Sequence, residues 1–328
     1  MALKNPPSRT LISSIPFLSG SLKPDILALE SQQRTEKDSV VSTYFLPSDE
    51  DERFRLNRQS RYLTNNACDG KLICVPLTLL PGDEILESGT GTGIWLIDLA
   101  KDLPATISLT GTDIESRLFP IHGQHPPNIS FFSYSVTDLP KSWDNKFKLI
   151  NQRLLTPALK REQWGSAILE LYRVLTPGGW IQLLESGPEI KLDHSGPNMT
   201  RIVNSLVSLH NMKGSVHDLQ YIIDQRLANA GFVNVQRKTV SLSPRAGLGK
   251  RDADSDYDHQ TIVFSFLEAA KKGFLATKMF QSEEEFDSVL KGMEKEWDQW
   301  ALAGRGGLWS WTVAYAQKPD TLPSGDYN

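Results

Sequence analysis

The sequence has few of the residues that mark a disulfide-rich, zinc-binding or membrane-spanning protein. Its 328 residues include only two cysteines, Cys68 and Cys74. Two cysteines cannot build a framework of several disulfides or supply the four ligands of a structural zinc site. No apolar run approaches the ~20 residues that cross a bilayer, and the amino-terminal stretch lacks the continuous apolar centre of a signal peptide. We therefore expect a cytoplasmic protein with reduced thiols, no metal centre and no membrane attachment.

The sequence also has no large excess of positive or negative charge. Thirty-five Lys and Arg stand against 39 Asp and Glu, which gives a formal net charge of -4. Nucleic-acid binding favours a basic surface that neutralises phosphates, so the sequence argues against a nucleic-acid partner. Hydrophobic residues make up 39% and charged residues 23%, which is typical of a globular protein and excludes a largely disordered chain.

Changes in residue pattern divide the chain into successive parts. We expect a flexible arm over 1–25, a helical cover over 26–80 that contains a helix over 63–80, a main domain over 81–318 with a helical insert at 243–308, and a tail over 319–328.

The main domain alternates short apolar segments with amphipathic ones, a pattern that predicts βαβ units and a mainly parallel sheet. We predict strands at 84–88, 107–113, 129–133, 147–151, 180–185, 232–242 and 309–317. We predict helices at 94–100, 163–175, 218–230, 258–277 and 283–300.

A glycine-rich turn between the first strand and the first helix of this domain carries the strongest functional signal. Gly89, Gly91 and Gly93 follow one another at alternate positions, and Glu87 precedes them. Dinucleotide-binding proteins instead use Gly-x-Gly-x-x-Gly, and Ile94 occupies the position of that third glycine. A carboxylate before the loop repels a diphosphate but suits a ligand with an amino group.

Asp113 lies at the end of the second predicted strand. In a βαβ unit, a carboxylate at this place can accept hydrogen bonds from both hydroxyls of a ribose. Together with Glu87, it predicts a ligand that combines a ribose with an amino or cationic group and has no diphosphate. S-adenosylmethionine fits this description.

These motifs resemble those of the class I S-adenosylmethionine-dependent methyltransferases, and in particular the fungal branch of secondary metabolism, which includes a regulator of secondary metabolism. The resemblance covers roughly 40–318 and is carried by EILESGTGTGIWLIDLA, GTDIESRLFP, PPNISFFSYSVTDLP and ILELYRVLTPGGWIQLLE. It implies an α/β fold with a Rossmann-like, seven-stranded, mainly parallel sheet, and transfer of a methyl group to O, N or S of a small secondary metabolite.

The resemblance also implies a set of cofactor contacts. The glycine loop would lie against the methionine part, with Glu87 near its amino end; Asp113 would bind the ribose and Ile114 would pack on the adenine. The full implied set is Glu87, Gly89, Thr90, Gly91, Gly93, Asp113, Ile114, Thr137, Asp138, Asn151, Gln152 and Arg153.

Two positions depart from the family pattern. The first motif reads Glu-Ser-Gly where the family usually has Asp-x-Gly, and Ser135 stands where an acidic residue is common, with Asp138 as the nearest carboxylate. Simpler interpretations also stay open: Asp138 as a surface turn residue, and Arg153 as a solvated or sheet-edge arginine.

Methyl transfer needs an aligned acceptor and, for a hydroxyl of high pKa, a base. The candidate bases are His194, His210, His217 and His259, and we rank His210 first because of its place after the fifth strand. The helical insert is aromatic, which favours a bulky or aromatic small-molecule substrate, although helical spacing of its Phe residues also fits a core.

One alternative function uses the same fold. A non-methylating relative could use the bound cofactor in a pericyclic or cyclising step, or regulate secondary metabolism through partners, because fold does not fix function. A nicotinamide oxidoreductase is disfavoured by the glycine spacing, and a nucleic-acid methyltransferase by the sequence Asn151-Gln152-Arg153-Leu154, which lacks an Asn-Pro-Pro-Tyr motif.

Overall fold

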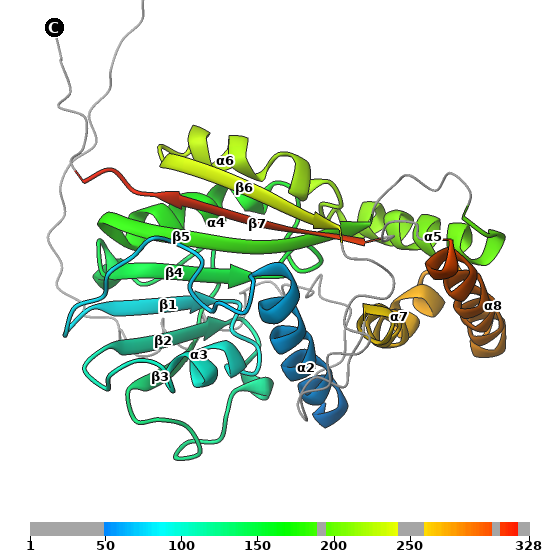
Figure 1. Ribbon diagram of the computed structural model, residues 1–328, viewed down its shortest axis with the longest axis horizontal. Helices are drawn as coiled ribbons and strands as arrows, with labels where there is room; N and C mark the ends of the chain where they lie inside the picture. Colours follow the sequence, from blue (N-terminus) through cyan, green and yellow to red (C-terminus); the bar gives the residue numbers. More distant parts are fainter. Residues whose placement is uncertain (1–48, 189–194, 242–258, 304–308, 321–328) are drawn as a thin grey trace, which may run out of the picture. The chain divides into compact units, whose positions relative to one another are not determined.

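Seven strands form one sheet in the order β3-β2-β1-β4-β5-β7-β6 (Figure 1). The strands are β1 (Glu84–Ser88), β2 (Ser108–Asp113), β3 (Ile129–Ser133), β4 (Phe147–Arg153), β5 (Leu175–Pro188), β6 (Val233–Ser241) and β7 (Trp309–Gln317). Only β7 runs antiparallel to its neighbours. The prediction of a seven-stranded, mainly parallel α/β fold is therefore confirmed.

The computed structural model describes residues 49–188, 195–241, 259–303 and 309–320. All of them belong to a single unit that spans Ser42–Asn328. The predicted arm over 1–25, the first part of the cover and the start of the insert lie outside the described residues.

Apolar residues cover both faces of the sheet. Ile85 and Leu86 are adjacent in β1 and point to opposite faces, and each is fully buried in a different cluster. One cluster contains α4 (Gln163–Val174) and α6 (Ile223–Asn229), and the other contains α3 (Ile94–Leu99). The sheet is therefore enclosed on both sides, as a parallel sheet requires.

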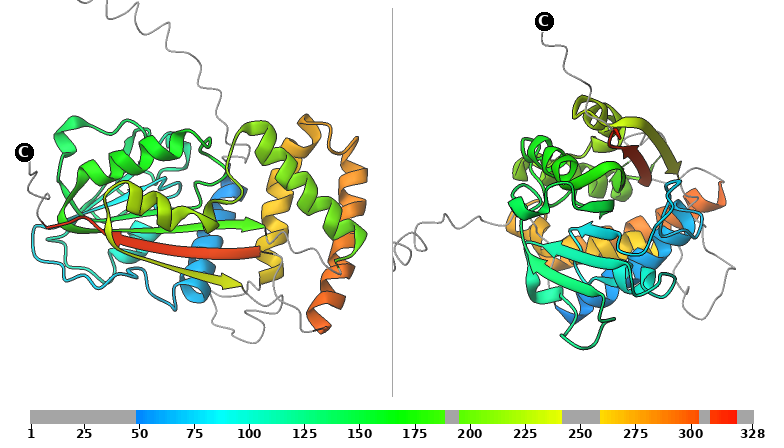
Figure 2. Two further views of the ribbon diagram at one scale, coloured as in Figure 1. Left: turned by 90° about the horizontal axis from the view of Figure 1, so that it is seen from above. Right: turned by 90° about the vertical axis from the view of Figure 1, so that its left-hand side faces the viewer.

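A third cluster joins the helices that lie beyond the carboxyl ends of the strands (Figures 1 and 2). It contains side chains from α2 (Glu50–Ala67), α5 (Pro197–Lys213), α7 (His259–Ala276) and α8 (Glu283–Leu302). Phe274 of α7, Phe280 between the two helices and Phe286 of α8 are buried here, so these aromatic residues belong to the core.

The helix predicted over 63–80 is wrong. The Asp49 side chain caps the amino end of α2 by accepting from the Glu52 N–H at 3.0 Å. The helix then runs unbroken to Ala67. It ends there because Asp69 and Gly70 adopt left-handed φ values of 54° and 78°, and the chain continues without helix to β1.

Helix α5 was not predicted, although its buried apolar residues Met199, Ile202, Val203, Leu206 and Leu209 recur at helical spacing. It begins with Pro197 at its first turn and ends at Gly214, which adopts φ 70°. The helix predicted over 218–230 is shorter than expected. A 3₁₀ turn at Leu219–Tyr221 precedes α6.

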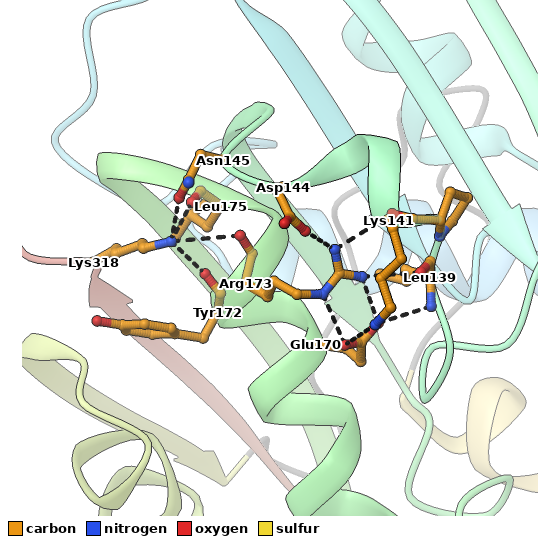
Figure 3. Close-up of polar contacts among 10 residues, drawn as sticks. Leu139, Lys141, Asp144, Asn145, Glu170, Tyr172, Arg173, Leu175 and Lys318 are labelled. Carbon is orange, nitrogen blue, oxygen red and sulfur yellow. Dashed lines mark hydrogen bonds and ion pairs between the residues drawn. The ribbon is translucent and has the colours of Figure 1, made fainter.

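Lys318 follows β7 and forms hydrogen bonds around the carboxyl end of α4 (Figure 3). Its buried ammonium donates to the carbonyls of Tyr172 and Leu175, each at 2.8 Å, and to Asn145 Oδ1 at 2.7 Å. Burial lowers the pKa of Lys318 below its ordinary value. These bonds satisfy carbonyl groups at the carboxyl end of α4 that have no partner within the helix.

No helix in the described ranges is both long and apolar enough to cross a membrane.

Candidate functional site

The parallel register brings the carboxyl ends of β1, β2 and β4 to one edge of the sheet. Ser88 pairs with Thr112 of β2 on one side and with Gln152 of β4 on the other. Glu87, Asp113 and Arg153 therefore end neighbouring strands at the same edge, where ligands bind in open α/β sheets. In Figure 1, α2 lies at this edge.

Glu87 is buried, and its carboxylate is held from three sides. Oε2 accepts from the Thr90 hydroxyl at 2.7 Å, and Oε1 accepts from Asn151 Nδ2 at 3.2 Å. The Arg153 guanidinium lies 3.7 Å from Oε1. Burial nevertheless outweighs these partners and raises the pKa of Glu87 from its ordinary 4.5 to about 7. A cation placed beside this group would favour the ionised carboxylate.

Asn151 connects Glu87 to β5 and to the chain before β1. Its Oδ1 accepts from Gln182 Nε2 at 3.0 Å, and the same nitrogen donates to the Leu72 carbonyl at 2.8 Å. Gln182 Oε1 accepts from the Cys74 N–H at 2.9 Å. All of these side chains are held in place by named partners, so the carboxylate of Glu87 has a fixed orientation.

The glycine loop is tightly packed at its ends and open in its middle. Gly89 and Gly93 adopt φ values of 67° and 70°, and a Cβ at these positions would lie 2.7 Å from Leu155 and 2.5 Å from Phe131. Gly91 also has a positive φ, of 52°, but a Cβ there would meet only Leu56, at 3.8 Å. The space over Gly91 is therefore where a ligand can approach the backbone of the loop.

Asp113 lies across the loop from Glu87. Its Oδ2 accepts from the Gly91 N–H at 2.9 Å, and its Oδ1 accepts from the Glu115 N–H at 3.1 Å. Burial raises the pKa of Asp113, and these N–H donors act in the opposite direction. The next side chain, Ile114, is 60% exposed. A half-buried carboxylate beside an exposed aliphatic side chain suits a ribose that carries a flat apolar base.

Helix α2 contributes contacts that the sequence reasoning missed. Asn57 Oδ1 accepts from the Thr92 hydroxyl in the glycine loop at 2.6 Å. Ser60 Oγ accepts from Arg153 Nη2 at 2.8 Å. Arg61 pairs with Asp98 of α3 at 3.3 Å. Polar residues one helical turn apart are a common surface pattern, so nothing in the sequence marked these as site residues.

The residues predicted as cofactor contacts after β3 and at the end of β4 differ from one another in exposure. Thr137 Oγ1 lies 2.8 Å from Ser135 Oγ, in a turn where the Asp138 N–H donates to the Ser135 carbonyl at 3.0 Å. Asp138 itself is exposed, and Gln152 is fully buried in β4. Their roles toward a cofactor stay predictions. Arg153 is largely buried and paired, so the interpretation as a solvated arginine is wrong.

A second buried carboxylate, Glu185 of β5, was also missed. It accepts from the Leu155 and Thr156 N–H groups at 3.1 and 3.0 Å and from the Thr156 hydroxyl at 2.6 Å. Burial raises the pKa of Glu185 to about 7. Because Leu155 packs against Gly89, Glu185 fixes the loop that closes one end of the glycine turn.

The candidate bases are dispersed. His210 is buried in the last turn of α5, with Nδ1 2.8 Å from Ser215 Oγ, and burial lowers its pKa to about 4. His259 lies at the start of α7, with Nδ1 3.2 Å from the Tyr62 hydroxyl. His194 lies outside the described residues. The catalytic role of His210 stays a prediction, and its contact with Ser215 also serves to close the end of α5.

No cluster of three or more His, Cys, Asp or Glu side chains that could hold a metal ion is found within the described ranges.

A family model described as a methyltransferase domain matches residues 85–179, the segment that holds the glycine loop and the first four strands. The chain is 32% identical over 265 residues to the methyltransferase psoC of Aspergillus fumigatus, a match that covers 77% of this chain and 90% of that protein. The chain belongs to the S-adenosylmethionine-dependent methyltransferases of fungal secondary metabolism.

Two further relatives carry a more specific name. The N-methyltransferase tcpN of Claviceps purpurea is 29% identical over 293 residues, which cover 86% of this chain and 99% of that protein. The N-methyltransferase sirN of Leptosphaeria maculans is 42% identical over 151 residues, but this match covers only 45% of this chain and 51% of that protein. The predictions of a methyltransferase enzyme and of its cofactor, S-adenosylmethionine, are confirmed.

The residues present at the strand ends fit this cofactor. Glu87 offers a buried carboxylate whose ionised form a neighbouring cation would stabilise. Asp113 and the exposed Ile114 stand together at the end of β2. Gly91 leaves the backbone of the loop accessible. When bound, the cofactor supplies an electrophilic methyl group on a sulfonium.

Proposed function

We propose that this methyltransferase transfers the methyl group to a nitrogen atom of a bulky or aromatic small secondary metabolite in the cytoplasm. The single observation that carries the cofactor half of this proposal is the pair Glu87 and Asp113, which end adjacent strands on either side of an open Gly91. The nitrogen acceptor is supported by the relatives named as N-methyltransferases.

Each site residue has a proposed role. Asp113 accepts hydrogen bonds from the ribose hydroxyls, Ile114 packs on the base, and Gly89, Gly91 and Gly93 let the methionine part lie along the loop. Glu87 holds the amino group, with Thr90 and Asn151 fixing its carboxylate. Arg153 offsets part of the charge of Glu87.

A nitrogen acceptor does not require a general base from the protein, whereas a hydroxyl acceptor of high pKa does. An unprotonated amine has a lone pair ready for attack, so alignment and exclusion of water supply most of the acceleration. Around the glycine loop, the described contacts of Glu87 and Asp113 are with hydrogen-bond donors that hold them in place. This arrangement supports a site that orients its ligands rather than one built around a strong base.

The proposal of a bulky or aromatic acceptor rests on the aromatic composition of the helical insert. The aromatic side chains that pack around His259 are those of Tyr62, Trp297 and Trp311, with ring centroids 6.2, 5.5 and 6.3 Å from the imidazole. All of them are buried in the core between the helices.

The proposal is tested with the full chain, trideuteromethyl-labelled cofactor and a metabolite extract from the native host. The expected product carries one labelled methyl group, and its fragmentation places the label on nitrogen. A label on oxygen or sulfur refutes the nitrogen acceptor. A product that isomerises without gaining the label would refute methyl transfer and support the pericyclic alternative.

The matched variants are Asp113→Asn and Asp102→Asn. Asp102 is an exposed aspartate in the turn after α3. We expect label transfer to fall strongly in the Asp113 variant and to stay at the wild-type rate in the Asp102 variant.

A further inference from the structure

The chain between α2 and β1 brings the two cysteines into contact. After Cys68 the backbone turns through the left-handed residues Asp69 and Gly70, and the Lys71 N–H donates back to the Cys68 carbonyl at 3.0 Å. The Cys74 thiol lies 3.8 Å from the Lys71 carbonyl. As a result, both cysteines line one small cavity.

The two thiols are chemically unequal. The interaction between the neighbouring thiols raises the pKa of Cys68 and lowers that of Cys74. The positive charges of Arg153 and Lys238 also favour a thiolate at Cys74, whereas burial and Asp69 oppose it. A thiol with a lowered pKa beside a second thiol is the arrangement of a reactive dithiol.

Both cysteines are free and only partly buried, so a small oxidant can reach them. They are also the only two cysteines of the chain. Any disulfide formed within one molecule must therefore join Cys68 to Cys74.

The same cavity reaches the cofactor site through a chain of hydrogen bonds. Asn151, Gln182 and Arg153 line it together with the two cysteines. The Cys74 N–H donates to Gln182 at 2.9 Å, Gln182 donates to Asn151 at 3.0 Å, and Asn151 donates to Glu87 at 3.2 Å. Three hydrogen bonds therefore connect the backbone of Cys74 to the carboxylate beside the glycine loop.

We propose that Cys68 and Cys74 form a reversible dithiol–disulfide site, and that its oxidation weakens cofactor binding by disturbing the hydrogen-bond chain from Cys74 to Glu87. The oxidant is a small-molecule disulfide. The thiol chemistry is independent of methyl transfer, whereas the effect on affinity rests on the proposed cofactor contacts of Glu87.

The step is thiol–disulfide exchange. Cys74, as thiolate, attacks one sulfur of the oxidant and forms a mixed disulfide with it. The S–S bond of the oxidant breaks, and its other sulfur leaves as a thiolate that takes up the proton released by Cys74. Cys68 then loses its proton and attacks the Cys74 sulfur of the mixed disulfide, and the second thiol departs with that proton. Two protein thiols are oxidised by two electrons to one disulfide, and one small disulfide is reduced to two thiols.

Formation of the bond brings the two sulfur atoms to about 2 Å from each other. Cys74 must then shift relative to Gln182, which is anchored to β5. Loss or weakening of one hydrogen bond in the chain corresponds to about a two- to tenfold loss of affinity.

The first experiment treats the full chain with glutathione disulfide and follows intact mass under denaturing conditions. We expect a monomer lighter by two hydrogens, and its reversal by dithiothreitol. The variant Cys68→Ser should instead stop at the mixed disulfide on Cys74, and Cys74→Ser should react much more slowly. No reaction, or adducts on both cysteines without closure, would overturn the redox site.

The second experiment measures S-adenosylmethionine binding to the reduced and oxidised forms by calorimetry. We expect two- to tenfold weaker binding by the oxidised wild type. The variant Gln182→Met still forms the disulfide but should bind equally in both states, because the hydrogen-bond chain is cut. Equal affinity of the two wild-type forms would overturn the coupling, whereas no binding by either form would refute the cofactor site itself.

Discussion

The raised pKa of Glu87 predicts that cofactor binding depends on pH near neutrality. In the free protein the carboxyl group titrates at about 7 because it is buried. If the ionised form holds the amino group of the cofactor, binding must remove the proton from Glu87. At pH 7 we expect release of about half a proton, and between pH 7 and pH 6 the dissociation constant should rise about fivefold.

The assay is titration calorimetry in buffers that differ in ionisation enthalpy, which reports proton release directly. The variant Glu87→Gln should bind more weakly and lose both the proton release and this pH dependence. Glu185 is the matched control, because its pKa is also raised to about 7 but its carboxylate is engaged by Leu155 and Thr156. The variant Glu185→Gln should keep the pH dependence of binding.

The amino group of the cofactor titrates in the same way with every variant, so the comparison isolates Glu87. An affinity of the wild type that does not change between pH 6 and pH 7 would refute the reasoning. So would a pH dependence in Glu87→Gln that is as large as that of the wild type.

The same titration affects stability in the absence of cofactor. The folded carboxyl keeps its proton up to about pH 7, whereas the unfolded one loses it near its ordinary pKa of 4.5. The free energy of unfolding therefore falls as pH rises between these values, by about 3 kcal/mol for Glu87. Chemical denaturation should show this fall in the wild type and a smaller one in Glu87→Gln.

Three further predictions concern single contacts. Gly93→Ala places a Cβ 2.5 Å from Phe131 at φ 70° and should destabilise the protein by about 2–4 kcal/mol in urea denaturation; a loss below 0.5 kcal/mol would contradict the strain. Lys318→Met leaves buried carbonyls without a donor and should lower the free energy of unfolding by about 2–4 kcal/mol in the same assay. The control Lys101→Met changes an exposed lysine and should lower it by less than about 1 kcal/mol. Asn57→Ala removes the bond from α2 to the glycine loop and should weaken cofactor binding several-fold by calorimetry, with unchanged affinity as the contrary result.

Strands such as β1 and β4 were predictable because each combines a short apolar run with a turn. The end of β1 and the start of α3 follow from the glycine loop. The strand over 309–317 was predicted, but its antiparallel direction was not. The carboxyl end of α2 could not be predicted, because the helix ends at the left-handed residues Asp69 and Gly70 and not at a change in the apolar pattern.

Glu87 and Asp113 could be predicted as site residues because a carboxylate at the end of a parallel strand commonly binds a ligand. It was not predictable where the partner is distant in sequence. Gln182 and Asn57 reach the site from β5 and α2, and only the fold brings them there. Glu185 could not be predicted for the same reason, because its carboxylate accepts from the N–H of Leu155, which lies thirty residues earlier in the chain.

The most direct test of the cofactor site is calorimetric titration of the full chain with S-adenosylmethionine, for the wild type and for Asp113→Asn. Charge-assisted hydrogen bonds contribute about 1.5–3 kcal/mol each, so the variant should bind at least about tenfold more weakly, while Asp102→Asn binds like the wild type. Failure of the wild type to bind, or equal binding by Asp113→Asn, would contradict the placement of the cofactor between Glu87 and Asp113.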